Sequence, residues 1–171
     1  ADYGHGLITP EVVRVLESNS KFLAVNTQVN ASNIGFHTIS KYTEADFVCI
    51  HEGELRHDYR SRTDKAEHLA KMLYNKMKCE HILITMGKKG SFGYNTQNGT
   101  VYCPAFASQV VDRVGAGDSV LAMTSLALAC QFPLDLTLLL GNLAGAQAVA
   151  TIGNKKATQK ELLLKSIKAI L

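Results

Sequence analysis

The sequence predicts an α/β fold in which a doubly wound, mostly parallel sheet carries an antiparallel hairpin at its edge. Short apolar runs rich in strand formers alternate along the chain with longer segments of helical periodicity. A glycine-rich turn stands directly before the long apolar segment at residues 120–130. Two alternating segments, residues 92–95 and 100–103, flank a turn signal at residues 96–99. These patterns indicate buried parallel strands, crossover helices and an edge hairpin.

The first predicted helix covers residues 10–19. Thr9 is a good N-cap, and Pro10 fits the first helical position because proline lacks a backbone N–H. The apolar side chains expected to face inward are those of Val12, Val13, Val15 and Leu16.

The next segment predicts a strand, a loop and a helix. Residues 21–26 form a short apolar run, as a buried parallel strand should. A polar loop is expected at residues 27–33. A weak helix at residues 34–42 should bury Phe36 and Ile39.

Two further buried strands are predicted at residues 46–50 and 81–85. Between them, residues 64–78 have the spacing of an amphipathic helix. Its inward positions are Ala66, Leu69, Ala70, Leu73 and Met77. The C-terminal part predicts three helices, one that begins at Asp118, one at residues 133–152 and one at residues 159–171.

Composition excludes several classes of protein. The 171-residue chain carries a net charge of +3 and has no basic run longer than two residues, so it offers no nucleic-acid surface. Its longest apolar run is too short to span a membrane. The four cysteines lie far apart, which argues against a metal cluster or a disulfide framework. Reduced thiols in the cytoplasm are the simplest interpretation.

The residues that carry chemistry precede the helix at 120–130. Gly115, Ala116 and Gly117 allow backbone N–H groups to crowd at a helix N-terminus, where unpaired donors and the macrodipole favour an anion. Asp118 would be the wrong charge beside a phosphate unless it acted as a general base. A helix start with a carboxylate in its first turn explains the same residues without a ligand.

This stretch resembles the signature Asp-Thr-x-Gly-Ala-Gly-Asp of the ribokinase-like (PfkB-type) carbohydrate kinases. Asp112 and residues 115–118 match the signature, whereas Arg113 occupies the threonine position. The resemblance implies that Gly115, Ala116 and Gly117 form an anion hole for the transferring phosphoryl group. It also implies that Asp118 takes the proton from the attacking sugar hydroxyl, with ATP and Mg²⁺ as cofactors.

Three further motifs resemble parts of the same family's nucleotide site. Thr85, Gly87 and Gly90 match its Thr-x-Gly-x-x-Gly phosphate loop, although a plain tight turn would use glycine too. Asn142 occupies a place that lies near the adenine in the family. Glu54 matches the last residue of the Asn-x-x-Glu motif that organises magnesium, but His51 replaces the asparagine. Two carboxylates in the first turn of a helix are the alternative explanation of Glu52 and Glu54.

Two more positions bear on ions and on the substrate. Asp112 and the loop around Gly153 match the region where many family members hold a monovalent cation such as K⁺. Residues 2–6 resemble the Asp-Tyr-x-Lys-Gly stretch of the heptose-phosphate kinase branch, with His5 in place of lysine. Asn26 replaces an aspartate that often ends the following strand. The resemblance thus implies a sugar or a sugar phosphate, such as heptose phosphate, as the acceptor. A glycine-rich turn between a strand and a helix needs no ligand and is the alternative.

The resemblance covers residues 1–171 as one kinase domain but only the C-terminal half of the family, whose members are usually about twice this length. We therefore expect weak nucleotide binding, no sugar phosphorylation by this chain alone, and either a homo-oligomer or association with an N-terminal half. A catalytically degenerate nucleotide-binding or interaction module is the alternative, favoured by Asn26, His51 and Arg113. A Rossmann dehydrogenase is disfavoured because the first strand-to-helix turn lacks Gly-x-Gly-x-x-Gly.

Overall fold

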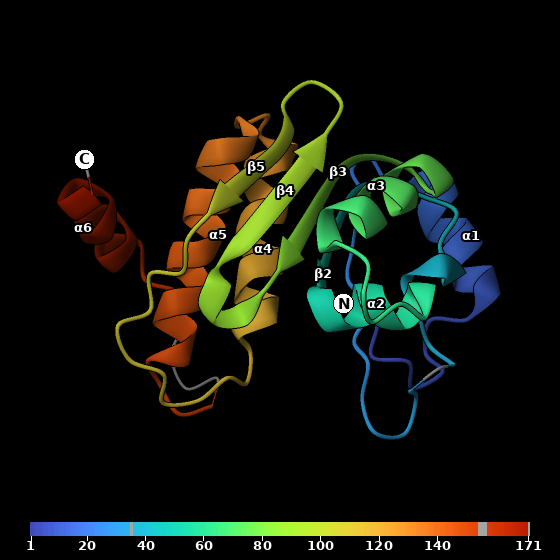
Figure 1. Ribbon diagram of the computed structural model, residues 1–171, viewed down its shortest axis with the longest axis horizontal. Helices are drawn as coiled ribbons and strands as arrows, with labels where there is room; N and C mark the ends of the chain where they lie inside the picture. The colour runs from blue at the N-terminus through green and yellow to red at the C-terminus, as the bar shows by residue number, and fades with distance from the viewer. Residues whose placement is uncertain (35, 154–156, 171) are drawn as a thin grey trace. The chain divides into compact units, whose positions relative to one another are not determined.

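The computed structural model describes residues 1–34, 36–153 and 157–170 (Figure 1). Its sheet has five strands in the order β1-β2-β3-β4-β5. Their bounds are β1 Ala24–Val25, β2 Glu44–His51, β3 Lys78–Thr85, β4 Ser91–Asn95 and β5 Gly99–Cys103. β1 pairs with β2 and β2 with β3, both in parallel, whereas β4 and β5 are sheet neighbours joined by a three-residue turn and are therefore antiparallel. The predicted α/β class and the hairpin are confirmed.

The chain divides into two compact units. The first contains Ala1–Thr85 and Gly93–Val101, and its helices are α1 Pro10–Asn19, α2 Glu52–Tyr59 and α3 Ala66–Lys76. The second contains Met86–Phe92 and the chain from Tyr102 onward, and its helices are α4 Ala116–Ala129, α5 Leu134–Val149 and α6 Lys160–Ile170. The hairpin strands are divided between the two units.

The core of the first unit lies on β2 and β3. Consecutive residues of both strands are almost inaccessible, as expected for parallel strands covered on both faces. These residues are Phe47, Val48, Cys49, Ile50, Ile82, Leu83 and Ile84. α3 buries its predicted apolar stripe and ends at Lys76, and Met77 directly after it is also buried. The helix predicted at residues 64–78 is therefore confirmed within two residues at each end.

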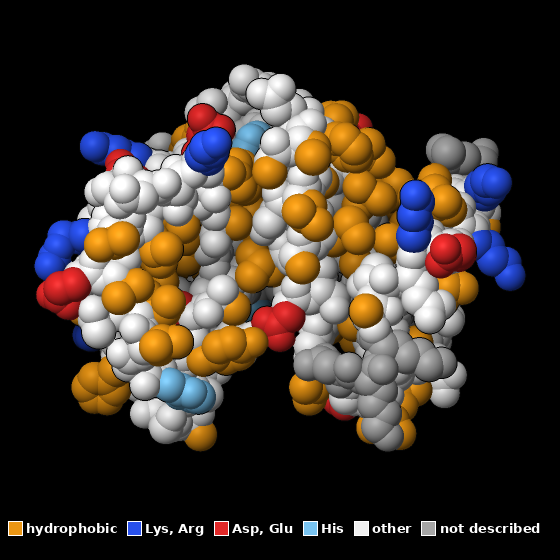
Figure 2. All heavy atoms as spheres, turned by 180° about the vertical axis from the view of Figure 1, so that it is seen from behind, with side chains coloured by type: hydrophobic (Ala, Val, Ile, Leu, Met, Phe, Trp, Pro, Cys, Tyr) orange, Lys and Arg blue, Asp and Glu red, His pale blue; other side chains and the backbone are white. Residues whose placement is uncertain are grey.

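α1 has the predicted bounds and the predicted cap, since the Thr9 side chain accepts a hydrogen bond from the N–H of Val12. Its inward face is narrower than expected. Val13 is buried, but Val12 and Val15 are 37% and 60% exposed. Hydrophobic side chains are likewise exposed over much of the face shown in Figure 2.

Of the predictions about residues 21–42, the parallel strand is confirmed but is shorter than expected, and the helix is wrong. The strand predicted at 21–26 is only two residues long, and the helix predicted at 34–42 is replaced by a short 3-10 helix, η1 Ile39–Lys41. Ile39 is buried as predicted, but Phe36 is 96% exposed. The Asn33 Oδ1 atom accepts from the N–H of Asn30 in the preceding turn, so this side chain does not serve as an N-cap for a helix at residues 34–42.

The second unit is built on the close contact of α4 and α5. A Cβ atom on Gly141 would lie 2.5 Å from the Thr124 methyl group, and one on Gly145 would lie 3.0 Å from Val120. The small residues of α5 therefore let the two helices approach closely. α4 begins at Ala116, two residues before the predicted start. No helix in the described part of the chain is long and apolar enough to cross a membrane.

Candidate functional site

The turn before α4 has the geometry of an anion site. Gly115 is the N-cap residue and has a left-handed conformation with φ of 77°, which favours glycine. Among the described residues, no side chain caps the helix at this end. A Cβ atom on Gly117 would meet no atom within 4 Å, so space is open above the first turn. The N–H of Ala116 donates to the Arg113 carbonyl at 3.4 Å, and a helix start of this kind leaves further backbone N–H groups without an intrahelical acceptor, where an anion can bind.

Asp118 lies in the first turn of α4, one residue after Gly117, and is half-buried. The structure thus brings together all four residues predicted to form the anion hole and the catalytic base. Their roles are not visible in the fold and stay predictions.

Asp112 fixes the loop that leads into this turn. Its Oδ1 atom accepts a hydrogen bond from the N–H of Val114 at 3.0 Å, and its Oδ2 atom accepts one from the N–H of Gly153 at 2.8 Å. These bonds hold the pKa of the Asp112 carboxyl below its usual range. The N–H groups of Val111 and Asp112 also donate to the carbonyl of Val149 at the end of α5. An ionised carboxylate is therefore held between the start of α4 and the segment after α5.

The predicted phosphate loop follows β3 and contains the short helix η2 Gly87–Lys89. Gly87 and Gly90 have positive φ values of 59° and 90°. A Cβ atom on Gly90 would lie 2.1 Å from the Cys103 carbonyl oxygen, so only glycine fits there, whereas one on Gly87 would meet nothing within 4 Å. The loop is thus tightly packed at one end and open at the other.

Asn142 lies beside this loop. Its Nδ2 atom donates to the Ser91 hydroxyl at 2.9 Å and to the Cys103 carbonyl at 3.3 Å. Two residues predicted to bind the nucleotide, Gly90 and Asn142, therefore pack on the same strand end. No contact to a base is visible, and the adenine role of Asn142 stays a prediction.

His51 and Glu54 form a capping box at the start of α2. The N–H of Gly53 donates to His51 Nδ1 at 3.0 Å, and the N–H of His51 donates to Glu54 Oε2 at 2.7 Å. Glu54 Oε1 also accepts from the N–H of Val29 at 3.3 Å. Burial raises the pKa of Glu54, and these hydrogen bonds only partly oppose that shift.

The capping box bears on the predicted magnesium site. Thr85 lies opposite His51 in the register of β3 and β2, so both residues stand at the carboxyl edge of the sheet, where ligands bind in such folds. No group of three or more His, Cys, Asp or Glu side chains that could hold a metal occurs among the described residues. The helix-start explanation of Glu54 is thus observed, and its metal role stays a prediction.

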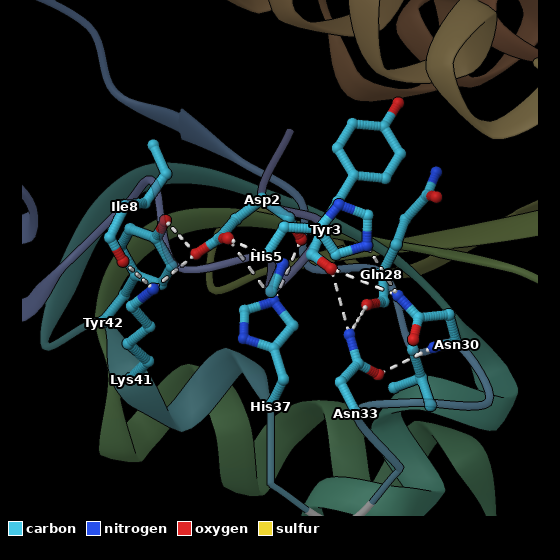
Figure 3. Close-up of polar contacts among 12 residues, drawn as sticks. Asp2, Tyr3, His5, Ile8, Gln28, Asn30, Asn33, His37, Lys41 and Tyr42 are labelled. Atoms are coloured by element: carbon cyan, nitrogen blue, oxygen red, sulfur yellow. Dashed lines mark hydrogen bonds and ion pairs between the residues drawn. The ribbon is translucent and has the colours of Figure 1, made fainter.

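One cluster was not foreseen from the sequence. Asp2 is buried and lies within hydrogen-bond distance of Lys41 and Tyr42 (Figure 3). The Asp-Tyr-x-x-Gly pattern drew attention to residues 2–6 but not to these partners, because they lie about forty residues away in an irregular segment. No local signal in residues 1–6 indicates that Asp2 is buried and needs a partner.

The family model for pfkB family carbohydrate kinases matches residues 11–161 of the chain. Among curated proteins, the chain is 32% identical over 167 residues to the bifunctional protein HldE of Koribacter versatilis, and the match covers 95% of this chain and 33% of that protein. It is 29% identical to HldE of Campylobacter fetus, covering 95% of this chain and 35% of that protein. The chain thus spans about a third of the length of these curated relatives.

Solved structures show the same fold. Phosphofructokinase-2 of Escherichia coli in complex with potassium matches with a TM-score of 0.78 at 18% identity, over 94% of this chain and 51% of that chain. Ribokinase of Arabidopsis thaliana with ribose and ATP matches with a TM-score of 0.72 at 19% identity, over 93% and 51%. The predicted doubly wound architecture is therefore confirmed.

Proposed function

Since the chain belongs to the pfkB family of carbohydrate kinases, we propose that it carries the nucleotide-binding and catalytic residues of an ATP-dependent sugar kinase. The proposed reaction transfers the γ-phosphoryl group of ATP to a hydroxyl of a sugar or a sugar phosphate. Such transfer depends on positioning and on electrostatic stabilisation rather than on covalent chemistry. The activity, substrate and assembly of the whole protein are part of this proposal.

The start of α4 carries the proposal. Gly115, in the left-handed conformation, is the N-cap of a 14-residue helix, and the backbone N–H groups and dipole at a helix N-terminus favour an anion. Asp118 stands in the same turn. An anion hole next to a carboxylate is the pair of groups that this transfer requires, one for the developing charge and one for the proton.

The proposed phosphoryl transfer forms one bond and breaks another. The acceptor oxygen forms a bond to the γ-phosphorus while the bond from that phosphorus to the ADP oxygen breaks. Asp118 removes the hydroxyl proton, and the amides of Gly115, Ala116 and Gly117 bind the transferring group. Bound ATP with Mg²⁺ supplies the phosphoryl group and neutralises its charge.

The nucleotide residues fit this assignment. Gly87 leaves the outer side of the loop open, and Gly90 allows close backbone packing beneath it, as a loop that holds phosphates needs. Asn142 packs at the base of the loop and is proposed to lie near the adenine. Glu54 already accepts two backbone hydrogen bonds, so we propose that it acts on magnesium through water rather than as a direct ligand. Asp112 is proposed to border a site for K⁺.

The proposed acceptor is a heptose phosphate. Two observations support it, the Asp-Tyr-x-x-Gly entry at residues 2–6 and the similarity to proteins named HldE. We propose that the protein acts in the cytoplasm, where ATP and reduced cysteines coexist.

A second candidate function is a nucleotide-binding or interaction module without kinase activity. The capping box favours this second candidate, because the side chains of His51 and Glu54 both accept hydrogen bonds from the backbone at the start of α2.

One experiment separates the two candidates. ADP formation by the full-length protein is measured with Mg²⁺ and K⁺ against a panel of free and phosphorylated sugars. The kinase proposal expects ADP formation that depends on one class of acceptor. Nucleotide binding by calorimetry without acceptor-dependent ADP formation would support the module instead.

A further inference from the structure

Arg113 is an isolated positive charge in the sequence. It is the only lysine or arginine between Lys89 and Lys155. The two carboxylates next to the proposed anion hole, Asp112 and Asp118, lie in the same stretch on either side of it. Arg113 is also the residue at which the chain departs from the threonine of the family signature. The position of this single positive charge therefore needs a chemical explanation.

The backbone places Arg113 directly beside the first turn of α4. Gly115 has a φ of 77° and a ψ of −2°, which are the angles of the third residue of a type II β-turn. The N–H of Ala116 donates to the Arg113 carbonyl at 3.4 Å, as the fourth residue of such a turn does. The first and fourth Cα atoms of a β-turn lie within about 7 Å of each other, so Arg113 starts next to the helix N-terminus. Its long side chain can therefore reach a group bound at that end.

The Arg113 side chain is exposed. Among the residues that the structure describes, no acidic side chain forms an ion pair with it. Arg14 and Arg56, by contrast, pair with Glu11 and Glu52. The guanidinium of Arg113 is thus available to a ligand, with its full set of N–H donors.

The carboxylates on either side make a positive charge useful at this place. Hydrogen bonds hold the pKa of the Asp112 carboxyl below its usual range, so this group is negatively charged at neutral pH. Asp118 lies in the first turn of α4 and is half-buried. A phosphoryl group that enters this turn would add further negative charge, and like charges at close range repel each other. Within residues 90–154, only Arg113 carries a positive charge that can offset this repulsion.

Arginine suits a phosphoryl group better than the threonine that it replaces. Its planar guanidinium offers N–H groups in a fork that matches two phosphate oxygens, and it is always charged. A threonine would offer one neutral hydroxyl group. The turn also engages the N–H of Ala116, one of the three amides proposed for the anion hole, so a further donor would strengthen the site.

Resting on the kinase function proposed above, we propose that Arg113 is a further catalytic residue, whose guanidinium binds the γ-phosphoryl group of ATP during transfer. Arg113 donates to the oxygens of that group from the side of the turn, and the backbone amides donate from the end of the helix. The guanidinium stays protonated, so the bond formed to the acceptor, the bond broken to ADP and the proton taken by Asp118 remain as described above. Arg113 is thus a change of the signature that serves phosphoryl transfer, not a sign of lost activity.

Steady-state kinetics of the full-length protein test this role. Arg113→Gln and Arg113→Thr should each lower kcat/KM for ATP by about tenfold to hundredfold, the worth of a hydrogen bond to a charged group. Arg113→Lys should recover part of the loss, because lysine keeps the charge without the fork. The matched control is Arg62→Gln, which removes an exposed arginine from the segment between α2 and α3 and should change nothing. A kcat/KM for Arg113→Thr equal to that of the wild type would overturn the proposal.

Calorimetry without an acceptor keeps this result separate from the kinase function. The full-length protein is titrated in Mg²⁺ with ADP or with the β,γ-imido analogue of ATP, whose γ-phosphoryl group is not transferred. Arg113→Gln should weaken binding of the analogue by about tenfold and leave ADP binding unchanged, which supports the proposal even if no sugar is phosphorylated. Undetectable binding, equal affinities of the two proteins for the analogue, or equal losses for both nucleotides would overturn it. A loss confined to the KM of a phosphorylated acceptor would place Arg113 on the acceptor and overturn it as well.

Discussion

The Asp112 carboxylate accepts a hydrogen bond from the N–H of Gly153 at 2.8 Å, although 41 positions separate the two residues. The bond ties the loop before the proposed anion hole to the chain after α5. The other carboxylate oxygen accepts from the N–H of Val114, so both oxygens point at backbone donors. These two bonds therefore hold in place the loop that leads into α4.

Replacing Asp112 by Ala should loosen this loop and lower turnover, because two backbone donors lose their acceptor and the proposed K⁺ site loses its charge. The measurement is turnover as a function of K⁺ concentration. The wild type should lose activity when K⁺ is exchanged for tetramethylammonium, and the variant should respond less. Glu161→Gln, an exposed carboxylate in α6, is the control. A variant with wild-type turnover and K⁺ response would remove Asp112 from both roles.

Two substitutions at Glu54 separate its cap from its proposed magnesium role. Because burial raises the pKa of Glu54 in the fold, its contribution to stability is present below the unfolded pKa of about 4.3 and is lost as pH rises through the folded value. Glu54→Gln keeps a neutral acceptor for the N–H of His51, so its melting temperature at neutral pH should not fall.

Glu54→Ala removes the acceptor as well and should cost about 1 kcal/mol, the usual value of a cap. Both variants should require more Mg²⁺ for turnover. Thermal unfolding together with a Mg²⁺ titration checks these effects. If the Mg²⁺ requirement of Glu54→Gln equals that of the wild type, Glu54 is a capping residue alone.

Asp2 should govern part of the acid unfolding of the protein. Burial alone would raise its pKa, but the hydrogen bonds from Lys41, Gly4 and Tyr42 and the nearby His37 outweigh burial and lower it. The stability that Asp2 contributes is therefore present above its unfolded pKa of about 3.9 and is lost as pH falls through the folded value. Urea unfolding of the wild type and Asp2→Asn should thus differ at pH 7 and converge in acid. Curves that stay parallel down to the lowest pH would contradict this account.

Self-association should involve the first unit. β1 is the end strand of the described sheet, and Leu7 and Phe36 are 85% and 96% exposed. Exposed strand edges and large apolar side chains favour contact with another chain. Light scattering after size exclusion should show a mass that grows with concentration, and Phe36→Ser should reduce that growth. Leu126→Ser, at a 66% exposed position in the second unit, is the control. A monomer mass at every concentration would contradict the prediction.

Most helices and the position of the turn before α4 could be predicted because their signals are local. Thr9 and Pro10 fix the start of α1, and residues 115–118 carry their own pattern. α4 nevertheless starts two residues early, since the left-handed Gly115 sets the helix start rather than the carboxylate. Periodicity marked Val15 as apolar but could not tell whether anything covers it.

Long-range pairing accounts for the larger errors. The burial of Asp2 depends on partners that no local pattern reveals, and Asn30 and Asn33 also donate to the Tyr3 carbonyl, 27 and 30 positions away. Lys41 bonds to Asp2, which lies 39 positions earlier in the chain. The sequence around Lys41 predicts only a weak helix. The position of Asn142 beside Ser91 also depends on a long-range contact, because it arises only when α5 packs.

Asp118 is proposed to act as the general base beside an anion hole, and the kinase function depends on this role. The decisive measurement compares wild type and Asp118→Asn in the full-length protein, with calorimetry for ATP and single-turnover kinetics for phosphoryl transfer. Asparagine keeps the size of the side chain and its place in the first turn, so nucleotide affinity should be nearly unchanged. Transfer should slow by roughly 10²–10⁴-fold, the usual contribution of a general base. Transfer at a rate close to that of the wild type would contradict the central claim.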